Sequence, residues 1–446
     1  MQKRTVKRIW WGLALTAVLA IAAVILIPKS EPAVAQGGPP AMGIVCTTDA
    51  DPNPTFNFTT HSGYVGTPDD NTIFMWGYSE GSNPFQYPGP TLCIDEGDTV
   101  TIILHNTLSE DVSIMFPGQD NVLANGEPTQ PQFDIGGDLV SLTNVAPANG
   151  GSVTYSFVAS HPGTFLYQSG TNPAIQVRMG LFGGMIVRPA LGPEYVTNRP
   201  DSKFNPDTEY LILFSEIDPY LNQAVERGDP FDLNNYRARY WLLNGRGFPD
   251  TIAPNFASWL PNQPYGSLAL VDPYDTNEFL TDGFTPNPAY NPDYSLDRFI
   301  NVMSQMQPMH PHGKMSLIVS RDGRPVEGQG GQDLAWENFS VPAGPGETWD
   351  GLFYWEDVEK YDPVTNPIPV EIPNLQNYVG GPLFSDSPYL GDKGTRPVGN
   401  TSLNQCGEYY IISHSHALHQ ITSWGVPTTG PVTFMRINPP QPNTCQ

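Results

Sequence analysis

The segment "QYPGPTLCIDEGDTVTIIL" (86–104) decides the fold class of this chain. A Pro-Gly turn leads into a short apolar run, and a Gly-Asp turn at 97–98 separates it from a second, alternating run. The alternation continues in "GSVTYSFVAS" (151–160), "GTFLYQSG" (163–170) and "GLFGGMIVRP" (180–189). No helical period of useful length interrupts these segments. The pattern predicts an all-β sandwich over about residues 45–195.

A second series of strand patterns follows the polar, proline-containing segment 199–209. Its members are "EYLILFSEID", "YWLLNGRGFPD", "GSLALVD", "DRFINVM", "KMSLIVSRDGRPV", "ETWDGLFYW", "EYYIISHSH" and "GPVTFMRINP". Two stretches rich in Pro, Asn, Asp and Gly, 273–296 and 358–404, interrupt the series and are expected to be ordered surface insertions. We therefore expect two domains, 36–198 and 199–446, which arose by duplication of one unit.

The N-terminus has the pattern of a targeting segment. Four basic residues within the first eight precede an apolar run over 9–28, and "AVAQ" offers a small-x-small cleavage site after Ala35. Residues 1–35 are therefore predicted to be a signal peptide. The length of the apolar run leaves an uncleaved anchor as the alternative. Both interpretations predict export, to a periplasmic, cell-surface or extracellular location.

The charge balance excludes several classes of partner. Without residues 1–35 the chain carries 16 Lys and Arg against 44 Asp and Glu, a formal charge of −28. Such an acidic protein repels nucleic acid and anionic membrane surfaces, and it attracts cations. The sequence also has no Gly-rich phosphate loop, no HExxH motif and no G-x-S-x-G motif. Membrane contact is expected only through an uncleaved N-terminal segment.

The four cysteines are expected to form disulfides, because their number is even and the chain is predicted to be exported. The pairing Cys46–Cys93 and Cys406–Cys445 is favoured, since each pair then lies within one half of the chain.

Two pairs of histidines stand out. "MQPMHPHG" (306–313) contains His310 and His312, and "HSHALHQ" (414–420) contains His414 and His416. At strand spacing both side chains of a pair project to one face. Two such pairs in one sandwich could bring four imidazoles to one point. Imidazole-rich sites suit copper or zinc, and a tetragonal nitrogen set favours Cu(II). The alternative is that these histidines form hydrogen bonds in a core or on a surface.

The chain resembles the multicopper oxidase family, which is built from cupredoxin domains, along nearly all of its predicted mature sequence. "YPGPTLCIDEGDTVTI" resembles the opening strand of the family's first domain, and "GTFLYQSG" with "GLFGGMIVRP" resembles the end of that domain. "WLLNGRGFPD" and "QPMHPHG" with "VSRDGRPV" resemble the second domain. The resemblance implies two cupredoxin-like Greek-key β-sandwich domains, with long loop insertions in the second, as in the two-domain branch of the family.

In that family a type 1 copper, bound by one cysteine and two histidines, takes single electrons from a substrate. The electrons pass through a His-Cys-His motif to a trinuclear copper cluster, held by four His-x-His pairs, where dioxygen is reduced to water. By position, two of these pairs are replaced, one by Met115 and Pro117 and one by Gln168 and Gly170. The other two are kept, as His310 with His312 and His414 with His416. The resemblance thus implies half of a cluster, which would hold one copper and at most two.

The type 1 position is changed as well. "HSHALHQ" stands where the family carries its final His-Cys-His motif, so Ser415 replaces the cysteine. Gln307 and Gln420 stand at the two histidine positions, and His419 is one residue out of register. Without a thiolate there is no blue copper site. The serine therefore marks a lost site of electron uptake.

The resemblance also implies a partner and two weaker ligand candidates. In the two-domain branch the cluster forms between the first domain of one subunit and the second domain of a neighbour, which predicts a homo-oligomer, specifically a trimer. Met115 would then face the four histidines, and it and His419 are weaker candidate ligands. Thioethers are soft and suit Cu(I), but packing in a core or an interface is the simpler role for the methionines at 303, 306, 309 and 315.

Two functions remain open from the sequence. The first is a copper-dependent oxidoreductase that uses the reduced histidine site. The second is a non-catalytic cupredoxin scaffold that serves copper storage or assembly. The missing cysteine argues against laccase-type turnover, whereas the four retained histidines argue against complete loss of metal binding. The sequence does not decide whether the protein is an enzyme.

Overall fold

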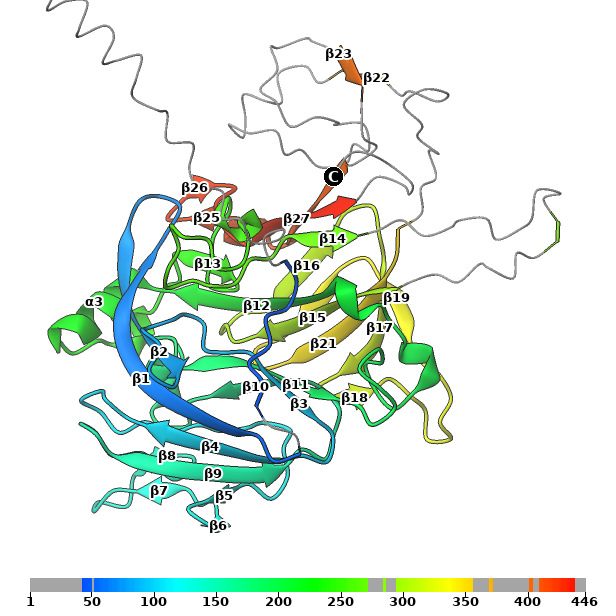
Figure 1. The fold of residues 1–446 in the computed structure, drawn as a ribbon. Coiled ribbons are helices and arrows are strands. Elements are labelled where there is room, and N and C mark those ends of the chain that lie inside the picture. The colour runs from blue at the N-terminus through cyan, green and yellow to red at the C-terminus, as the bar shows by residue number, and fades with distance from the viewer. Residues whose placement is uncertain are drawn as a thin grey trace, which may run out of the picture. The chain divides into compact units, whose positions relative to one another are not determined.

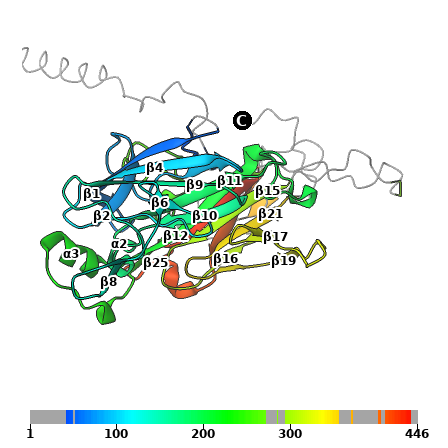
Figure 2. The ribbon, with the colours of Figure 1, turned by 90° about the horizontal axis from the view of Figure 1, so that it is seen from below.

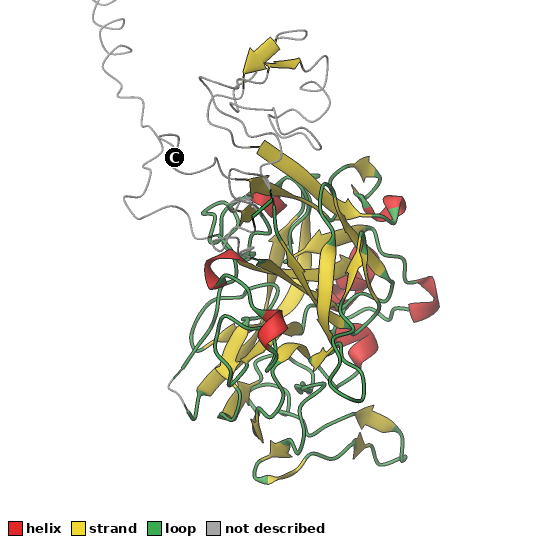
Figure 3. Cartoon of the chain, turned by 90° about the vertical axis from the view of Figure 1, so that its right-hand side faces the viewer, coloured by secondary structure: helices red, strands yellow, loops and turns green. Residues whose placement is uncertain are grey.

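The computed structural model describes residues 42–49, 52–271, 284–285, 294–355, 369–371, 401–403 and 409–437. Within these residues strands and loops dominate and helices are short, so the predicted all-β class is confirmed (Figure 3). The predicted signal peptide, the Cys406–Cys445 pair and most of the two insertions lie outside the described residues. None of the helices within the described part has the length and apolar character needed to cross a bilayer.

The first sandwich consists of a six-stranded sheet, ordered β2-β1-β4-β9-β5-β6, and a three-stranded sheet, ordered β10-β11-β3 (Figure 1). A two-stranded ribbon, β7-β8, is attached to it. The bounds are β1 Thr55–Gly66, β2 Thr72–Glu80, β3 Leu92–Asp95, β4 Thr99–His105, β5 Leu123–Ala124, β6 Glu127–Pro128, β7 Gln132–Phe133, β8 Leu139–Ser141, β9 Ser152–Val158, β10 Gly163–Gln168 and β11 Phe182–Arg188.

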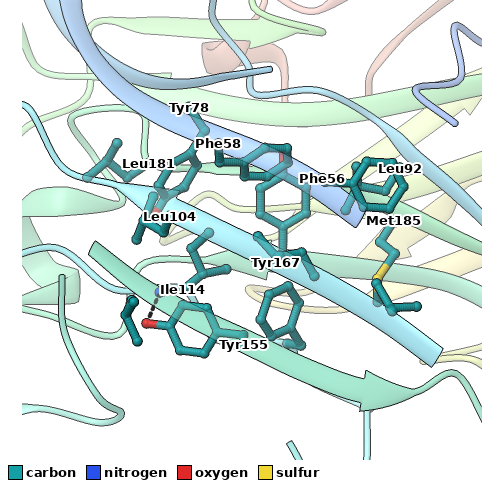
Figure 4. Packing of buried hydrophobic residues seen from close by; sticks show 14 of the residues in the cluster. Phe56, Phe58, Tyr78, Leu92, Leu104, Ile114, Tyr155, Tyr167, Leu181 and Met185 are labelled. Carbon is teal, nitrogen blue, oxygen red and sulfur yellow. Dashed lines mark hydrogen bonds between the residues drawn. The ribbon is translucent and has the colours of Figure 1, made fainter. Parts of the chain in front are cut away.

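Alternation in these strands produces the core that the sequence predicts. In β4 the residues Val100, Ile102 and Leu104 are fully buried, while the residues between them are more exposed. Figure 4 shows part of this core, in which the buried Tyr155 hydroxyl accepts a hydrogen bond from the Ile114 N–H (3.1 Å). The predicted Cys46–Cys93 disulfide is present and ties the segment before β1 to β3.

The second sandwich consists of a nine-stranded and a five-stranded sheet. The larger sheet has the order β18-β17-β21-β15-β12-β13-β25-β26, with β19 also paired to β17, and the smaller sheet has the order β14-β27-β24-β16-β20. The bounds are β12 Glu209–Ile217, β13 Tyr240–Leu243, β14 Ala269–Val271, β15 Ser295–Asn301, β16 Gln307–Pro311, β17 Ser316–Arg321, β18 Arg324–Pro325, β19 Trp336–Asn338, β20 Val341–Ala343, β21 Thr348–Phe353, β24 Tyr409–Ser415, β25 Thr422–Ser423, β26 Val426–Pro427 and β27 Val432–Ile437.

The remaining elements are a ribbon and short helices. The ribbon pairs β22 with β23. The bounds are β22 Pro369–Glu371, β23 Thr401–Leu403, α2 Pro173–Gln176, α3 Pro219–Arg227, and the 3-10 turns η1 Pro200–Ser202, η2 Pro206–Thr208, η3 Leu233–Asn235, η4 Asp250–Ile252 and η5 Leu418–Gln420.

The two sandwiches repeat one topology. The order β2-β1-β4-β9 recurs as β13-β12-β15-β21, and β10-β11-β3 recurs as β24-β27-β14, with the same strand directions in each case. Asn106, just after β4, and Asn301, at the end of β15, are both fully buried. Each side-chain oxygen accepts from the N–H two residues on. Each amide donates to the carbonyl four residues on and to distant carbonyls, two for Asn106 and one for Asn301. This agreement supports the predicted duplication.

Helix α3 was not expected from the sequence, which we interpreted as strands and loops throughout. Its signals are nevertheless local: Asp218 caps the first turn by accepting from the Tyr220 N–H, Pro219 occupies the first helical position, and Gly228 ends the helix with a φ of 70°. The helix lies at one edge of the sheets (Figure 2). Asn222 joins it to β2 by donating to the Phe74 carbonyl (2.8 Å).

A buried ionic network joins the two sandwiches. Arg298 of β15 is fully buried and donates to Glu209 of β12, to Asp350 of β21 (3.3 Å) and to the Thr164 hydroxyl of β10 (2.9 Å). Arg188 of β11 donates to both oxygens of Glu209 (2.6 and 2.7 Å). Buried charges of this kind are tolerated only when they are paired and hydrogen-bonded. Glu209 therefore balances one guanidinium from each sandwich.

We predict that Glu209→Gln lowers the free energy of unfolding at pH 7 by about 3–5 kcal/mol, because it leaves buried guanidinium groups without their counter-charge. Burial raises the pKa of Glu209, but Arg298 and Arg188 outweigh it, so the pKa lies below the ordinary glutamate value. The stabilisation is therefore complete above the unfolded-state pKa, about 4.3, and is lost as the pH falls through the lowered pKa.

Urea unfolding between neutral and acid pH measures both effects. The exposed Glu127→Gln serves as the matched control and should behave like the natural protein. An unfolding free energy of Glu209→Gln equal to that of the natural protein at pH 7 would contradict the role of the network.

Candidate metal centre

The pairing of β16 with β24 sets the position of the histidines. In β16 the residues Gln307, Met309 and Pro311 are buried, and the alternating positions, including His310, face outward. His310 lies directly opposite His414 in the antiparallel ladder. Two further bonds extend the pairing: the His312 N–H donates to the Ile412 carbonyl (3.0 Å), and the His416 N–H donates to the Pro308 carbonyl (2.7 Å).

The structure brings the four predicted imidazoles together. The ring centres of His310 lie 4.7 Å from His312, 5.7 Å from His414 and 4.9 Å from His416. The ring centres of His312 and His414 are 5.1 Å apart, and those of His414 and His416 are 6.1 Å apart. His416 is exposed and the other three are half-buried, so solvent reaches the cluster. We refer to these four residues as the histidine cluster.

Backbone carbonyls orient two of the rings. Nδ1 of His310 lies 2.7 Å from the Phe339 carbonyl, and Nδ1 of His414 lies 2.8 Å from the Ser415 carbonyl. A carbonyl oxygen can only accept, so each Nδ1 carries the proton and donates. In the neutral ring Nε2 then keeps its lone pair. In histidines that bind metals, the ring nitrogen that does not bind the metal typically donates to a carbonyl or carboxylate in this way.

Nε2 of His312 and Nε2 of His414 point toward each other at 3.0 Å. Two nitrogen ligands about 2.0 Å from one metal and about 90° apart would be separated by about 3 Å, so this pair fits a shared ion. As the side chains stand, the described residues contain no complete group of three or more ligand side chains around one point. The two rings share a hydrogen bond instead, and a metal would have to displace its proton.

Burial lowers the pKa of His414, and the neighbouring imidazoles of the cluster act in the same direction. The hydrogen bond to the Ser415 carbonyl opposes this effect without cancelling it. His414 is therefore more readily neutral than an ordinary histidine, and neutral imidazole is the form that binds a metal.

The two weaker candidates lie elsewhere. His419 is on η5, and its ring centre lies 5.8 Å from that of Trp241, with the two ring planes nearly perpendicular. Met115 belongs to the first sandwich and forms a backbone bridge with Gln168. Among the four methionines, Met303 and Met309 are buried in the core of the second sandwich, whereas Met306 and Met315 are about half exposed.

The repeated topology shows which residues of the first sandwich match the cluster histidines of the second. Met115 is opposite Gln168 in the same antiparallel manner as His310 is opposite His414. Gly170 corresponds to His416, and a Cβ added at Gly170 would lie 2.7 Å from the Met115 Cγ. The Met115 side chain thus occupies the space that an imidazole at position 170 would need.

The residues at the predicted type 1 position do not fit a blue copper site. Ser415 is fully buried, and its hydroxyl donates to the Gln420 Oε1 (2.7 Å). The Gln420 amide donates to Gln305 (3.3 Å) and to the Met306 carbonyl (3.2 Å). Gln307 is also fully buried, and its amide has no hydrogen-bond partner within the described part of the chain. This set offers hydroxyl and amide groups where copper needs thiolate and imidazole.

The first sandwich contains a matching serine–glutamine pair. The Ser169 hydroxyl donates to the Gln176 Oε1 (2.7 Å) and accepts from the Thr171 N–H (3.1 Å). Ser415 donates to Gln420 and accepts from the Ala417 N–H (3.2 Å) in the same way. Because both copies of the unit use this pair to hold the turn after the strand, its role is structural.

Part of the chain is similar to a known family. Residues 81–191 match the family model described as multicopper oxidase. L-ascorbate oxidase from Cucurbita maxima is 30% identical over 181 residues, which cover 39% of this chain and 28% of that protein. Putative laccase-5 from Oryza sativa subsp. japonica is 28% identical over 149 residues, which cover 32% of this chain and 24% of that protein. The chain thus spans less than a third of the length of these curated relatives.

Solved structures share the fold over most of the chain. A blue copper oxidase from Nitrosomonas europaea covers 85% of this chain and 85% of its own, with a TM-score of 0.52 and 17% identity. The multicopper oxidase mgLAC covers 88% of this chain and 87% of its own, with a TM-score of 0.53 and 17% identity. The fold is therefore that of paired cupredoxin-like domains. Residues 81–191 are thus similar to the multicopper oxidase family, and the fold of the chain is shared with solved structures of that name.

A restoration experiment tests the assignment of the type 1 position. We predict that the triple variant Gln307→His, Ser415→Cys, Gln420→His shows an intense blue absorption band after copper loading, because it supplies one thiolate and two imidazoles. Ser415→Cys alone should stay colourless for lack of the imidazoles. Optical spectra of the folded, copper-loaded variants make the comparison. A blue band in the single variant would contradict the assignment of Gln307 and Gln420.

Proposed function

We propose that this chain is an exported copper-binding protein of the multicopper oxidase family that lacks a type 1 copper. His310, His312, His414 and His416 would hold the metal, with one copper at each histidine cluster and at most two. The observation that carries the proposal is the convergence of the four rings, in which the centres of neighbouring rings lie 4.7–6.1 Å apart. The carbonyl partners of His310 and His414 support it, since they leave Nε2 available.

The proposal includes a redox role that differs from laccase-type turnover. When bound, copper supplies one-electron chemistry and a Lewis-acid centre. Ser415 and Gln420 are buried and bonded to each other, so the chain provides no sulfur path from a distant electron donor. A substrate would therefore have to reach the histidine cluster itself. The exposure of His416 is compatible with such direct access.

We also propose a homo-oligomer, for which a trimer is the arrangement implied by the two-domain branch. Phe339, whose ring centre lies 5.6 Å from that of His310, is exposed beside the histidine cluster, and Leu418 and Met306, close to it in sequence, are exposed as well. The first sandwich exposes a second apolar surface on and beside the ribbon β7-β8, formed by Phe133, Ile135, Leu139, Val140 and Leu142. Contiguous exposed apolar surface is typical of a contact between subunits.

Export to an oxidising compartment rests on two observations. The first is the basic and then apolar N-terminal pattern, which lies outside the described residues. The second is the Cys46–Cys93 disulfide, since such bonds persist mainly in secreted, periplasmic and surface proteins.

The double variant His312→Ala, His416→Ala tests the proposed metal site. We expect its copper affinity to fall by more than ~100-fold, because loss of a ligand costs more than loss of an outer hydrogen-bond partner, which alone costs ~10–100-fold. Circular dichroism and the melting temperature should stay close to those of the natural protein, since both side chains lie outside the cores. Copper is measured by elemental analysis after dialysis against a weak chelator.

His161→Ala is the matched control, because His161 is an exposed histidine of the first sandwich that bonds Asp120. It should retain all of the copper. Unchanged copper content in the double variant would remove His312 and His416 from the site. Absence of copper from the natural protein after reconstitution would instead indicate a scaffold without metal.

A further inference from the structure

A cavity that none of the cluster histidines lines lies between the two sandwiches. It has a volume of about 250 Å³ and is open to solvent. Its walls come from the start of β2, from one face of α3, from β13 and from the hairpin between β25 and β26; the lining residues that matter here are Phe74, Tyr220, Glu226, Tyr240 and Trp424. We call this cavity the aromatic pocket. Small-molecule sites occur preferentially at such junctions between domains.

Three of the aromatic rings lie side by side. The Trp424 ring centre lies 5.7 Å from that of Tyr220 and 6.2 Å from that of Tyr240. The ring planes are tilted by 54° and 36°, so the rings do not form a flat surface. Tyr220 and Trp424 remain exposed although they are large and apolar, with 57% and 43% of their surface accessible. The pocket is therefore lined by two accessible aromatic side chains, whereas Tyr240 beneath them is only 1% exposed.

The position of Trp424 is conformationally unfavourable. Trp424 and Gly425 form the two-residue turn between β25 and β26, with φ angles of 50° and 83°. Such turns normally carry Asn, Asp or Gly at both positions, because a bulky side chain is disfavoured at positive φ. Backbone strain of this kind is found where a side chain is needed for function. Here it directs the indole toward Tyr220 and Tyr240.

The charge at the pocket is negative. Among the described residues that line it, Glu226 is the one charged side chain, and it accepts a hydrogen bond from the Tyr64 hydroxyl. Asp69 lies just behind the wall, where it accepts from the Tyr240 hydroxyl (2.9 Å). The Arg239 guanidinium lies 5.8 Å from the Trp424 ring centre but does not line the pocket. The Trp424 ring is thus already close to one cation.

We infer that the aromatic pocket binds a small organic cation, of the class of alkylated ammonium ions. The π-faces of the exposed Tyr220 and Trp424 would contact its alkyl groups and stabilise its charge, as aromatic rings do for quaternary ammonium groups, while the buried Tyr240 supports Trp424 from behind. Glu226 supplies a nearby counter-charge. A sugar ring would instead be expected to stack on a flat aromatic surface, and the tilts of the three rings do not provide one. The inference is independent of copper binding.

Isothermal titration calorimetry of the whole protein with choline chloride tests the inference. The neutral isostere 3,3-dimethylbutan-1-ol, in which carbon replaces the quaternary nitrogen, is titrated in parallel. We expect one choline per chain, with an affinity at least ~10-fold higher than that of the isostere, since only the cation gains from the rings and from Glu226. Glu226→Gln should weaken choline binding and leave the binding of the isostere unchanged.

Trp424→Gly is expected to abolish choline binding. Glycine accepts a positive φ, so this change removes the ring while it favours the turn. Trp336→Ala is the matched control, because Trp336 is similarly exposed (40%) but lies on β19, and it should bind choline normally. The inference is overturned if choline does not bind, if the isostere binds equally well, if a methyl glycoside binds instead of choline, or if Trp424→Gly and Trp336→Ala behave alike.

Discussion

The architecture depends on one buried charge, the guanidinium of Arg298. It has no access to solvent, and its partners Glu209, Asp350 and Thr164 come from three different strands of both sandwiches. Because an unpaired charge at this depth would cost several kcal/mol, the sandwiches can pack only in the arrangement that keeps these partners together. The strand that carries Arg298, β15, leads through a short loop to β16. The same constraint therefore fixes the start of β16, the strand that carries His310.

The register of β16 against β24 then decides the chemistry. A slip of one residue would turn His310 into the core and bring Met309 to the surface, since successive side chains point to opposite faces. In the observed register four imidazoles converge, and the Nδ1 atoms of His310 and His414 donate to backbone carbonyls. The second sandwich thus has histidines at all four positions that the resemblance assigns to ligands. In the first sandwich Met115 and Gln168 occupy the equivalent positions.

Much of this could be predicted from sequence, for reasons that are local. Alternation and turn residues located the strands, and the spacing of His310 and His312 placed both rings on one face. Other features depend on residues far apart in the chain. The Phe339 carbonyl beside His310, the match between Ser169 and Ser415, and the meeting of Tyr220 with Trp424 follow only from tertiary packing. Helix α3 differs from these features, because its capping residues are local and could have predicted it. The strand patterns on both sides of it led to the prediction of a loop.

The central claim is a copper site built of imidazoles without a thiolate. Its most direct test is the copper content of the purified natural protein, together with its electron paramagnetic resonance and optical spectra. The account predicts about one copper per chain, a tetragonal signal with coupling to nitrogen ligands, and no intense blue band. An intense blue band, or three coppers per chain, would contradict it, because either result would require ligands that the described residues do not supply.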